Sequence, residues 1–477
     1  MLMMNKKLLF SLLFCCVTTG LLLANKSEFT KAAHYFNHGE YSELKHFSDS
    51  IRRANPTNED ANKIDSLCEI ASRIQLDFSL SEPKTEAQIR TKIGSFTLSD
   101  KKLWEENNWL ECKIIDGQKR YFNRAVSNLK LRLNQHNDSI NHRPAPIDSI
   151  IAFRLRHTAH AIAQTTQPGA LSSPVHYTLT YTVSVKPDVV PAGETISCWL
   201  PFPKENRTRQ SNVLLLEASK KDYKIAPDSC GHRSIYMEKK AVANKPTEFR
   251  IKVSYTGSAQ YFDLNKTRIA PYKKKSELYK KYTEQQGKHI LFTSHIKSLA
   301  DKIVGKEKRP EKIVQKLYEW IDGHIIWSGA LEYSTMDNIP EYVLEHRRGD
   351  CGMQTLLFMT MARYKGIPVK WQSGWMLHPN EVNLHDWCEV YYEGVGWVPL
   401  DMSFGLQPSH NHAVRYFYMS GMDAYRLIVN DEISAPFNPE KKFMRSEPVD
   451  FQRGEVEWKG GNLYFDKWDY HMDVDYQ

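Results

Sequence analysis

The chain has 477 residues, of which 41% are hydrophobic and 12% aromatic. This apolar content excludes an intrinsically disordered protein, and the length predicts two or three domains that each bury a core. The mean hydropathy of −0.54 excludes a membrane protein with many spans. A net charge of +8, from 64 basic and 56 acidic residues, is too small for this length to predict nucleic-acid binding, which requires a concentrated basic stripe.

Residues 1–24 have the pattern of a targeting segment. Two lysines are followed by residues 8–24 (LLFSLLFCCVTTGLLLA), which are apolar or small. This order is typical of a secretory signal peptide, so we expect an extracytoplasmic protein, whether periplasmic, in the cell envelope or secreted. Cleavage near Ala24 fits the small-residue preference only in part, because Leu22 is bulky, and an uncleaved segment would anchor the chain in a membrane. Lipidation of one of the segment's two cysteines is a less favoured alternative.

Helical spacing dominates residues 25–165, and we expect a helical accessory domain there, followed by a short linker containing Gly, Pro and Ser. The pattern then changes to alternation of apolar and polar residues, over 175–185 and again over 249–255. Alternation of this kind predicts strands with one buried face, and prolines between the two runs mark turns. We therefore predict a β-sandwich of about immunoglobulin size over residues 174–262.

Six cysteines follow the targeting segment, and no two of them have the CxxC spacing of a zinc or redox motif. We expect no metal and no cofactor. An exported protein could pair Cys68 with Cys112 or Cys198 with Cys230, and the sequence does not assign these pairs. The lysine-rich stretch 264–310 predicts a solvated surface and not a nucleic-acid site.

The run from Cys351 to Tyr364 is apolar nearly all round, which predicts a buried helix. Asp350 precedes this helix as an N-cap candidate, and Gly366 and Pro368 follow its end. Cys351 then lies in the first helical turn, where free N–H groups and the helix dipole favour a thiolate. The Asp350 carboxylate opposes this effect, so a reactive thiol needs a histidine partner. Taken alone, the cysteine is better explained as an inert buried residue.

A hairpin is expected at residues 384–403, where aromatic and β-branched residues flank a glycine-rich turn. His385 lies on its first strand and Asp401 on its second. A pairing centred on Glu393 sets these two residues directly opposite each other, with Cβ atoms about 5 Å apart, and a register shift of two or three residues would separate them. A helix-start thiol followed by such a hairpin predicts a triad, in which Cys351 attacks, His385 moves its proton and Asp401 orients the imidazole.

Five motifs in this order resemble the transglutaminase-like superfamily. They are Gly349-Asp350-Cys351-Gly352, Gly366-Ile367-Pro368-Val369, Ser373-Gly374-Trp375, His385-Asp386-Trp387-Cys388-Glu389-Val390 and Gly396-Trp397-Val398-Pro399-Leu400-Asp401. The resemblance covers about residues 310–405 and carries the triad onto Cys351, His385 and Asp401. It implies a papain-like α+β core, with a helix packed on an antiparallel sheet over residues 290–405, within a multidomain α+β protein.

Two departures from the family pattern are Cys388 in the histidine strand and the short segment of 34 positions (385 − 351) between Cys351 and His385. The short segment is similar to compact bacterial members and puts cross-linking activity in doubt. The family often adds an oxyanion donor from upstream of the cysteine, and Trp327 is our candidate because an indole N–H can donate. A core aromatic residue on a strand is the alternative explanation of Trp327. The β-like pieces of residues 406–477 are expected to complete the core sheet.

Three functions fit these observations. The first is an exported cysteine peptidase or amidase that hydrolyses a peptide or carboxamide bond through a thioacyl-enzyme. The second is a protein-glutamine acyltransferase, in which an amine captures the same intermediate. The third is a non-catalytic binding module that retains only the fold. The expected partner is a protein or peptide substrate, and the sequence does not indicate the oligomeric state.

Overall fold

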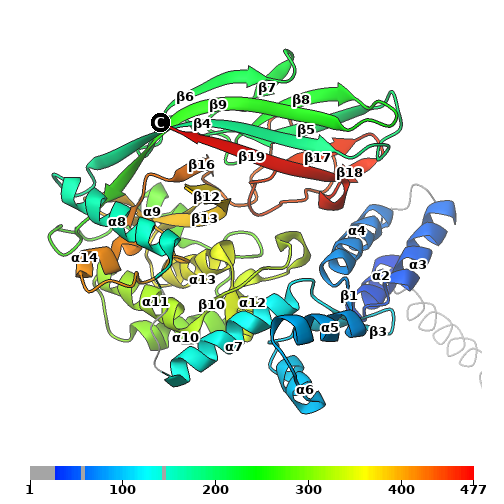
Figure 1. Cartoon of the computed structure of the whole chain (residues 1–477), viewed down its shortest axis with the longest axis horizontal. Coiled ribbons are helices and arrows are strands. Elements are labelled where there is room, and N and C mark those ends of the chain that lie inside the picture. The colour runs from blue at the N-terminus through cyan, green and yellow to red at the C-terminus, as the bar shows by residue number, and fades with distance from the viewer. Residues whose placement is uncertain (1–26, 55–59, 142–146) are drawn as a thin grey trace, which may run out of the picture. The chain divides into compact units, whose positions relative to one another are not determined.

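The computed structural model describes residues 27–54, 60–141 and 147–477 (Figure 1). The chain forms two compact units, one up to Lys130 and one from Leu131 to Gln477. The expected targeting segment, residues 1–24, lies outside the described residues. Among the helices that are described, none is long and apolar enough to cross a membrane.

The first unit is helical, as the spacing in this part of the chain predicts. Its elements are α2 (Glu28–Asn37), α3 (Tyr41–Ala54), α4 (Ala61–Asp77), β1 (Leu80–Ser81), α5 (Glu82–Lys92), α6 (Leu98–Glu106), β2 (Cys112–Ile115) and β3 (Gln118–Tyr121). The hydroxyls of Ser27 and Thr97 accept backbone N–H bonds at the starts of α2 and α6, which satisfies donors that a helix start leaves open. The three short strands form an antiparallel sheet in the order β1-β3-β2.

The second unit contains most of the helices and strands. Its helices are α8 (Ser149–Gln164), α9 (Glu277–Thr283), α10 (Ser294–Val304), α11 (Pro310–His324), α12 (Ile339–His346), α13 (Cys351–Tyr364) and α14 (His412–Arg415), and α7 (Ala125–Asn141) leads into it from the first unit. Its central antiparallel sheet has the order β14-β13-β12-β16, made of β12 (Val369–His378), β13 (Glu381–Tyr392), β14 (Gly396–Leu400) and β16 (Arg426–Asn430). Helix α13 packs against β12 and β13, as predicted, with α10, α11 and α12 around it.

Strand β12 contributes to two hydrophobic cores. Val369 and Trp371 lie in the core with the helices, whereas Trp375 and Leu377 lie in the core of the sandwich. The central sheet therefore lies between α13 and the sandwich (Figure 1). Gly374 lies in β12 between the residues of the first core and those of the second. A Cβ at this position would come within 1.9 Å of the Leu427 carbonyl oxygen of β16, so the close approach of β16 requires a glycine.

The predicted sandwich strands are present and pair with each other. Strand β4 (Leu171–Val185) runs antiparallel to β9 (Thr247–Tyr261), and the alternation of apolar residues matches the alternation of burial. The other strands of this region are β5 (Thr195–Pro201), β6 (Gln210–Ala218), β7 (Tyr223–Ile225) and β8 (Ser234–Lys240). One sheet has the order β15 (Gly421–Met422), β9, β4, β19 (Trp468–Tyr476), with β6 on β9. The other has the order β18 (Gly461–Leu463), β17 (Glu455–Trp458), β5, β8, β7.

The C-terminal strands join three different sheets, whereas we expected residues 406–477 to complete the core sheet. Of them only β16 joins the central sheet. The others are β15 (Gly421–Met422), β17 (Glu455–Trp458), β18 (Gly461–Leu463) and β19 (Trp468–Tyr476), and all belong to the sandwich. The physical reason is that β4 and β5 each leave an open edge, which β19 and β17 cover.

The six cysteines after the targeting segment are free thiols. Neither of the pairs that the sequence left open, Cys68 with Cys112 and Cys198 with Cys230, forms a disulfide in this structure.

Candidate active site

Cys351 is the first residue of α13, as predicted. Asp350 is the N-cap, and its Oδ1 accepts a hydrogen bond from the Met353 amide at 3.1 Å. Before it, Arg347 has a positive φ of 53° and turns the chain out of α12. The Gln354 side chain then donates to the Gly349 carbonyl at 3.0 Å. The loop before the cysteine is therefore fixed from both sides.

The Cys351 thiol contacts Asp386 of β13, with Sγ 3.6 Å from Oδ2. Desolvation raises the pKa of this thiol well above its usual value, and the carboxyls of Asp386 and Asp350 raise it further. The backbone amide of Asp386 acts in the opposite direction, because it donates toward the sulfur. In this arrangement the sulfur carries its proton, and Asp386 accepts a hydrogen bond from it.

His385 and Asp401 are brought together, with 2.6 Å between Nε2 and Oδ2. Both side chains are buried. The other oxygen of Asp401 accepts from the amide and the hydroxyl of Ser403, each at 3.1 Å. Although burial raises the pKa of Asp401, His385 and the Arg426 guanidinium together lower it to about 2. Asp401 is therefore an ionised carboxylate fixed beside the imidazole.

The hairpin register differs from the expected one by a single turn residue. The pairs Cys388 with Leu400 and Tyr392 with Gly396 centre the hairpin on Gly394 and not on Glu393. The loop has three residues, with Gly394 at a positive φ of 81°, a conformation that glycine adopts without strain. As a result the position opposite His385 moves by two residues, and Asp401 lies diagonal to His385. The two side chains still meet, so the expectation that a shift of this size separates them is wrong.

The Cys351 sulfur contacts Asp386, the residue that follows His385 in β13. Strand β14 ends at Leu400, which pairs with Cys388, so the ladder from β14 does not reach Asp386. Within the described residues His385 Nδ1 has no hydrogen-bond partner, and the Cys351 thiol is bonded to Asp386 and not to the imidazole. The structure thus assembles the His385–Asp401 pair and places Cys351 next to it, without a thiol–imidazole hydrogen bond.

Trp327 lies close to the backbone of the nucleophile loop. It belongs to β10 (Ile326–Trp327), which pairs in parallel with β11 (Arg348–Gly349) and sets Trp327 beside Gly349. The next amide, of Ser328, donates to the Gly349 carbonyl at 3.2 Å. Trp327 is 50% exposed, so it is not a core aromatic residue.

A group of buried polar residues around the sulfur was not predicted from the sequence. Gln452 donates to the His385 carbonyl at 2.9 Å and to Asp386 Oδ1 at 2.7 Å. Tyr333 donates to Asp350, the N-cap. Burial raises the pKa of Asp386 well above its usual value, and the nearby carboxyls of Asp450 and Asp350 raise it further. In the sequence, the one local indication of this group was Asp386 itself, an acidic residue between His385 and Trp387 in the histidine motif.

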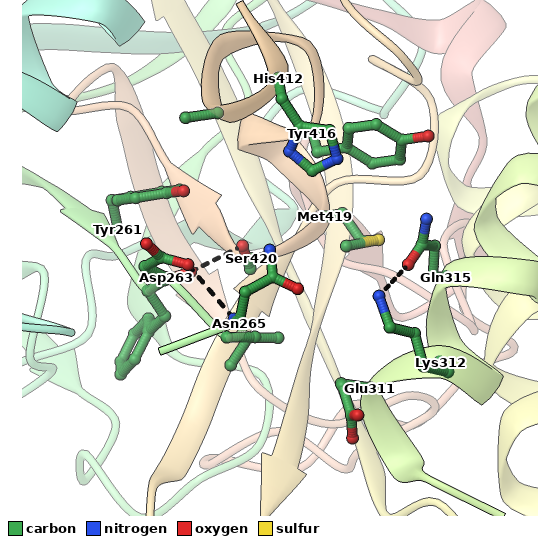
Figure 2. A pocket seen from close by; sticks show the side chains of 13 residues that line it. Tyr261, Asp263, Asn265, Glu311, Lys312, Gln315, His412, Tyr416, Met419 and Ser420 are labelled. Carbon is green, nitrogen blue, oxygen red and sulfur yellow. Dashed lines mark hydrogen bonds between the residues drawn. The ribbon is translucent and has the colours of Figure 1, made fainter. Parts of the chain in front are cut away.

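Figure 2 shows a cavity in the second unit that contains none of the predicted site residues. Lys312 and Gln315 of α11 face His412 and Tyr416 across it, and Lys312 donates to Gln315 at 3.0 Å. Its empty volume, which includes open solvent, is about 400 Å³, and none of its lining residues is Cys351, His385 or Asp401.

The chain is similar in part to known proteins. Residues 297–402 match the family model described as the transglutaminase-like superfamily. No curated protein matches the sequence. Among solved structures, a candidate cysteine protease from Cytophaga hutchinsonii has 12% identity and a TM-score of 0.45, covering 64% of this chain and 92% of its own. The periplasmic domain of TgpA from Pseudomonas aeruginosa has 11% identity and a TM-score of 0.26, covering 56% of this chain and 94% of its own.

The matched segment begins in α10 and ends just after β14. It includes Trp327, the cysteine at the start of α13, and the hairpin with His385 and Asp401. The second unit of this chain therefore contains a transglutaminase-like domain at residues 297–402.

Proposed function

We propose that this protein is an exported thiol hydrolase that cleaves a peptide or carboxamide bond through a thioacyl-enzyme. The observation that supports it most directly is the His385–Asp401 pair, with 2.6 Å between Nε2 and Oδ2, one residue away from the contact of the Cys351 thiol. Export is part of this proposal and rests on the apolar segment 8–24.

The reaction starts when the Cys351 side chain turns from Asp386 toward the free Nδ1 of His385 and transfers its proton there. The thiolate then attacks the substrate carbonyl, and the oxyanion accepts hydrogen bonds from the Cys351 amide and the Trp327 indole. His385 next gives its proton to the leaving amine. Water hydrolyses the thioester with His385 as base, and Asp401 stays ionised throughout, orienting the imidazole.

The other parts of the chain serve substrate placement in this proposal. The helical region up to residue 165 and strands β4 to β9 precede the catalytic core in sequence, and strands β15, β17, β18 and β19 follow it. In this proposal the substrate is a protein or peptide, which supplies the amide carbonyl that the thiol attacks.

Alkylation of Cys351 by iodoacetamide across pH tests the nucleophile, with the modified peptide followed by mass spectrometry. His385→Ala is expected to slow alkylation at neutral pH by about tenfold or more, since the imidazolium no longer stabilises the thiolate. His289→Gln is the matched control, because His289 is also buried and lies in the helical core. Equal rates in the wild type and His385→Ala would contradict the proposal.

A glutamine-containing peptide, incubated with and without a primary amine, tests the fate of the acyl group. Hydrolysis produces the acid or cleaved peptide in both reactions, and Cys351→Ala abolishes it. A cross-linked amide that forms only with the added amine would instead show acyl transfer. Activity that persists unchanged in Cys351→Ala would leave only a binding module.

A further inference from the structure

Arg426 connects the catalytic carboxylate to a second buried acid. This residue begins β16, and its side chain is buried. One guanidinium nitrogen lies 3.1 Å from Asp401 Oδ2, the same oxygen that binds His385. The other lies 3.0 Å from Asp423 Oδ1. The guanidinium is thus held between two carboxylates, and it shares one acceptor atom with the imidazole.

Asp423 anchors the far side of the guanidinium. Its Oδ1 also accepts from the Tyr425 amide at 2.8 Å, and its Oδ2 accepts from the Tyr418 hydroxyl at 2.7 Å. His378 of β12 lies 3.1 Å from the same Oδ2. Arg426 and His378 hold the pKa of Asp423 well below its usual value, although burial acts against them. Asp423 is therefore a charged and fully bonded support.

We infer that Arg426 is a positioning residue of the proposed thiol site. Anchored by Asp423, it holds the Asp401 carboxylate in place and limits the proton affinity of His385. This inference rests on the proposed function. A cation that shares the carboxylate with an imidazole weakens the attraction of that carboxylate for the imidazolium. The same cation keeps Asp401 ionised and in one orientation.

An arginine suits this position better than a lysine. The planar guanidinium presents separate N–H groups to two carboxylates at once, whereas an ammonium is a single point charge. The Arg426 guanidinium also lies over the Phe404 ring at 4.8 Å, and that ring is 5.1 Å from the His385 ring. Phe404 thereby packs against both the positioning residue and the base.

Other charged groups face His385 from the neighbouring elements. Glu381 on the same strand lies close enough for His385 to lower its pKa, after the stronger effects of His378 and Arg154. Arg154 of α8 lies over the Phe404 ring at 4.0 Å. Neither substitution removes these groups. Glu381 lies 3.9 Å from His378, which in turn binds Asp423, so Arg426→Gln is the more direct probe of the Arg426 link.

The test is an NMR titration of His385 in the full chain, with labelled histidine and the signal assigned through His385→Ala. Arg426→Gln is expected to move the midpoint of the His385 titration to higher pH by about one pH unit, because a nearby cation is lost. Asp423→Asn is expected to move it to lower pH, because the cation loses its counter-charge. Arg426→Lys restores the midpoint toward the wild-type value. A purely structural role does not produce shifts of opposite sign.

Arg363→Gln is the matched control, since Arg363 is a buried arginine of α13 that donates to the Val369 carbonyl and lies outside the Asp401 network. It leaves the His385 midpoint unchanged. An unchanged midpoint in folded Arg426→Gln, or a shift in the same direction for Arg426→Gln and Asp423→Asn, would overturn the inference. If Arg426→Gln does not fold, the direction of the midpoint shift in Asp423→Asn decides: a shift to lower pH supports the inference and a shift to higher pH overturns it. The alkylation experiment on His385→Ala tests the proposed function separately.

Discussion

At the scale of single residues, Asp386 controls the charge on the sulfur. It is buried, and its Oδ2 accepts from the Cys351 thiol at 3.6 Å. When Asp386 is ionised, its carboxylate at this distance opposes formation of a second negative charge on the sulfur. Asp386 therefore keeps the thiol protonated until the side chain turns toward His385.

Asp386→Asn is expected to lower the pH at which Cys351 becomes reactive. The amide has the shape of the carboxyl, keeps an acceptor for Gln452 and adds an N–H that donates to a thiolate. The rate of iodoacetamide alkylation at pH 7 should rise by about tenfold, which corresponds to about one pKa unit. Asp450→Asn is the control, because Asp450 raises the pKa of Asp386 without being among the main influences on that of Cys351. A slower reaction in Asp386→Asn would contradict this role.

The same substitution has a stability effect that depends on pH. Because burial raises the pKa of Asp386 above its unfolded value of about 3.9, the folded state binds more protons than the unfolded state as pH rises. The contribution of Asp386 to the free energy of unfolding is fully present below the unfolded pKa of about 3.9. It is lost as pH rises through the folded pKa. The amide side chain of the variant does not titrate, so the melting temperature of Asp386→Asn minus that of the wild type should increase from pH 5 to pH 8. A difference that is constant over this range would contradict a buried, titrating Asp386.

At the scale of elements, the start of α13 requires a glycine after the nucleophile. A Cβ on Gly352 would come within 2.3 Å of the Tyr333 hydroxyl and 2.5 Å of Asp386 Oδ2. Both groups are buried, so they cannot move aside without breaking their hydrogen bonds. The glycine lets these two side chains close over the first turn of the helix.

Gly352→Ala is expected to destabilise the protein by about 1–2 kcal/mol and to disturb the reactivity of Cys351. Overpacking costs about 1–3 kcal/mol, and the better helix propensity of alanine offsets less than about 1 kcal/mol of it. Gly323→Ala in α11 is the matched control, because a Cβ there meets no atom within 4 Å. Urea unfolding should show a lower midpoint for Gly352→Ala and an equal or higher one for Gly323→Ala. Equal midpoints for both variants would argue against the close contact.

Local patterns predicted the elements better than their partners. The apolar run predicts α13 with its N-cap, and alternation predicts β4 and β9, because both depend on residues close together in sequence. The hairpin centre lies at Gly394 and not at the expected Glu393, because the three-residue loop places a positive φ at Gly394. Composition does not distinguish these two turns.

The contacts that complete the site come from chain topology. Arg426 meets Asp401 because β16 pairs with β12, although β13 and β14 lie between them in sequence. The β-like pieces of residues 406–477 were all expected in the core sheet, and of their strands β16, which begins at Arg426, joins it. Gln452 reaches Asp386 from 66 positions away for the same reason. Periodicity carries no information on such pairings, so these partners could not be predicted.

At the scale of the whole molecule, the sandwich and the catalytic core of the second unit share a strand. Because β12 has side chains in both hydrophobic cores, loss of one core exposes part of the other. The C-terminal strand β19 closes the sandwich through Trp468, which is buried and donates from its indole to the Leu463 carbonyl at 2.8 Å. We therefore expect residues 131–477 to unfold as one cooperative unit.

Trp468→Ala tests this coupling with two thiols that the fold supplies. Cys198 is fully buried in the sandwich and Cys388 is fully buried in the central sheet, so each reacts with a maleimide only after its own core opens. Loss of a buried tryptophan costs about 3–5 kcal/mol. It should lower the urea midpoint for labelling of both thiols together, although Trp468 lies in the sandwich. Asp475→Ala, an exposed position on the same strand, should leave both midpoints unchanged. A fall confined to Cys198 would mean that the catalytic core keeps its structure without the sandwich, and that the shared strand does not couple them.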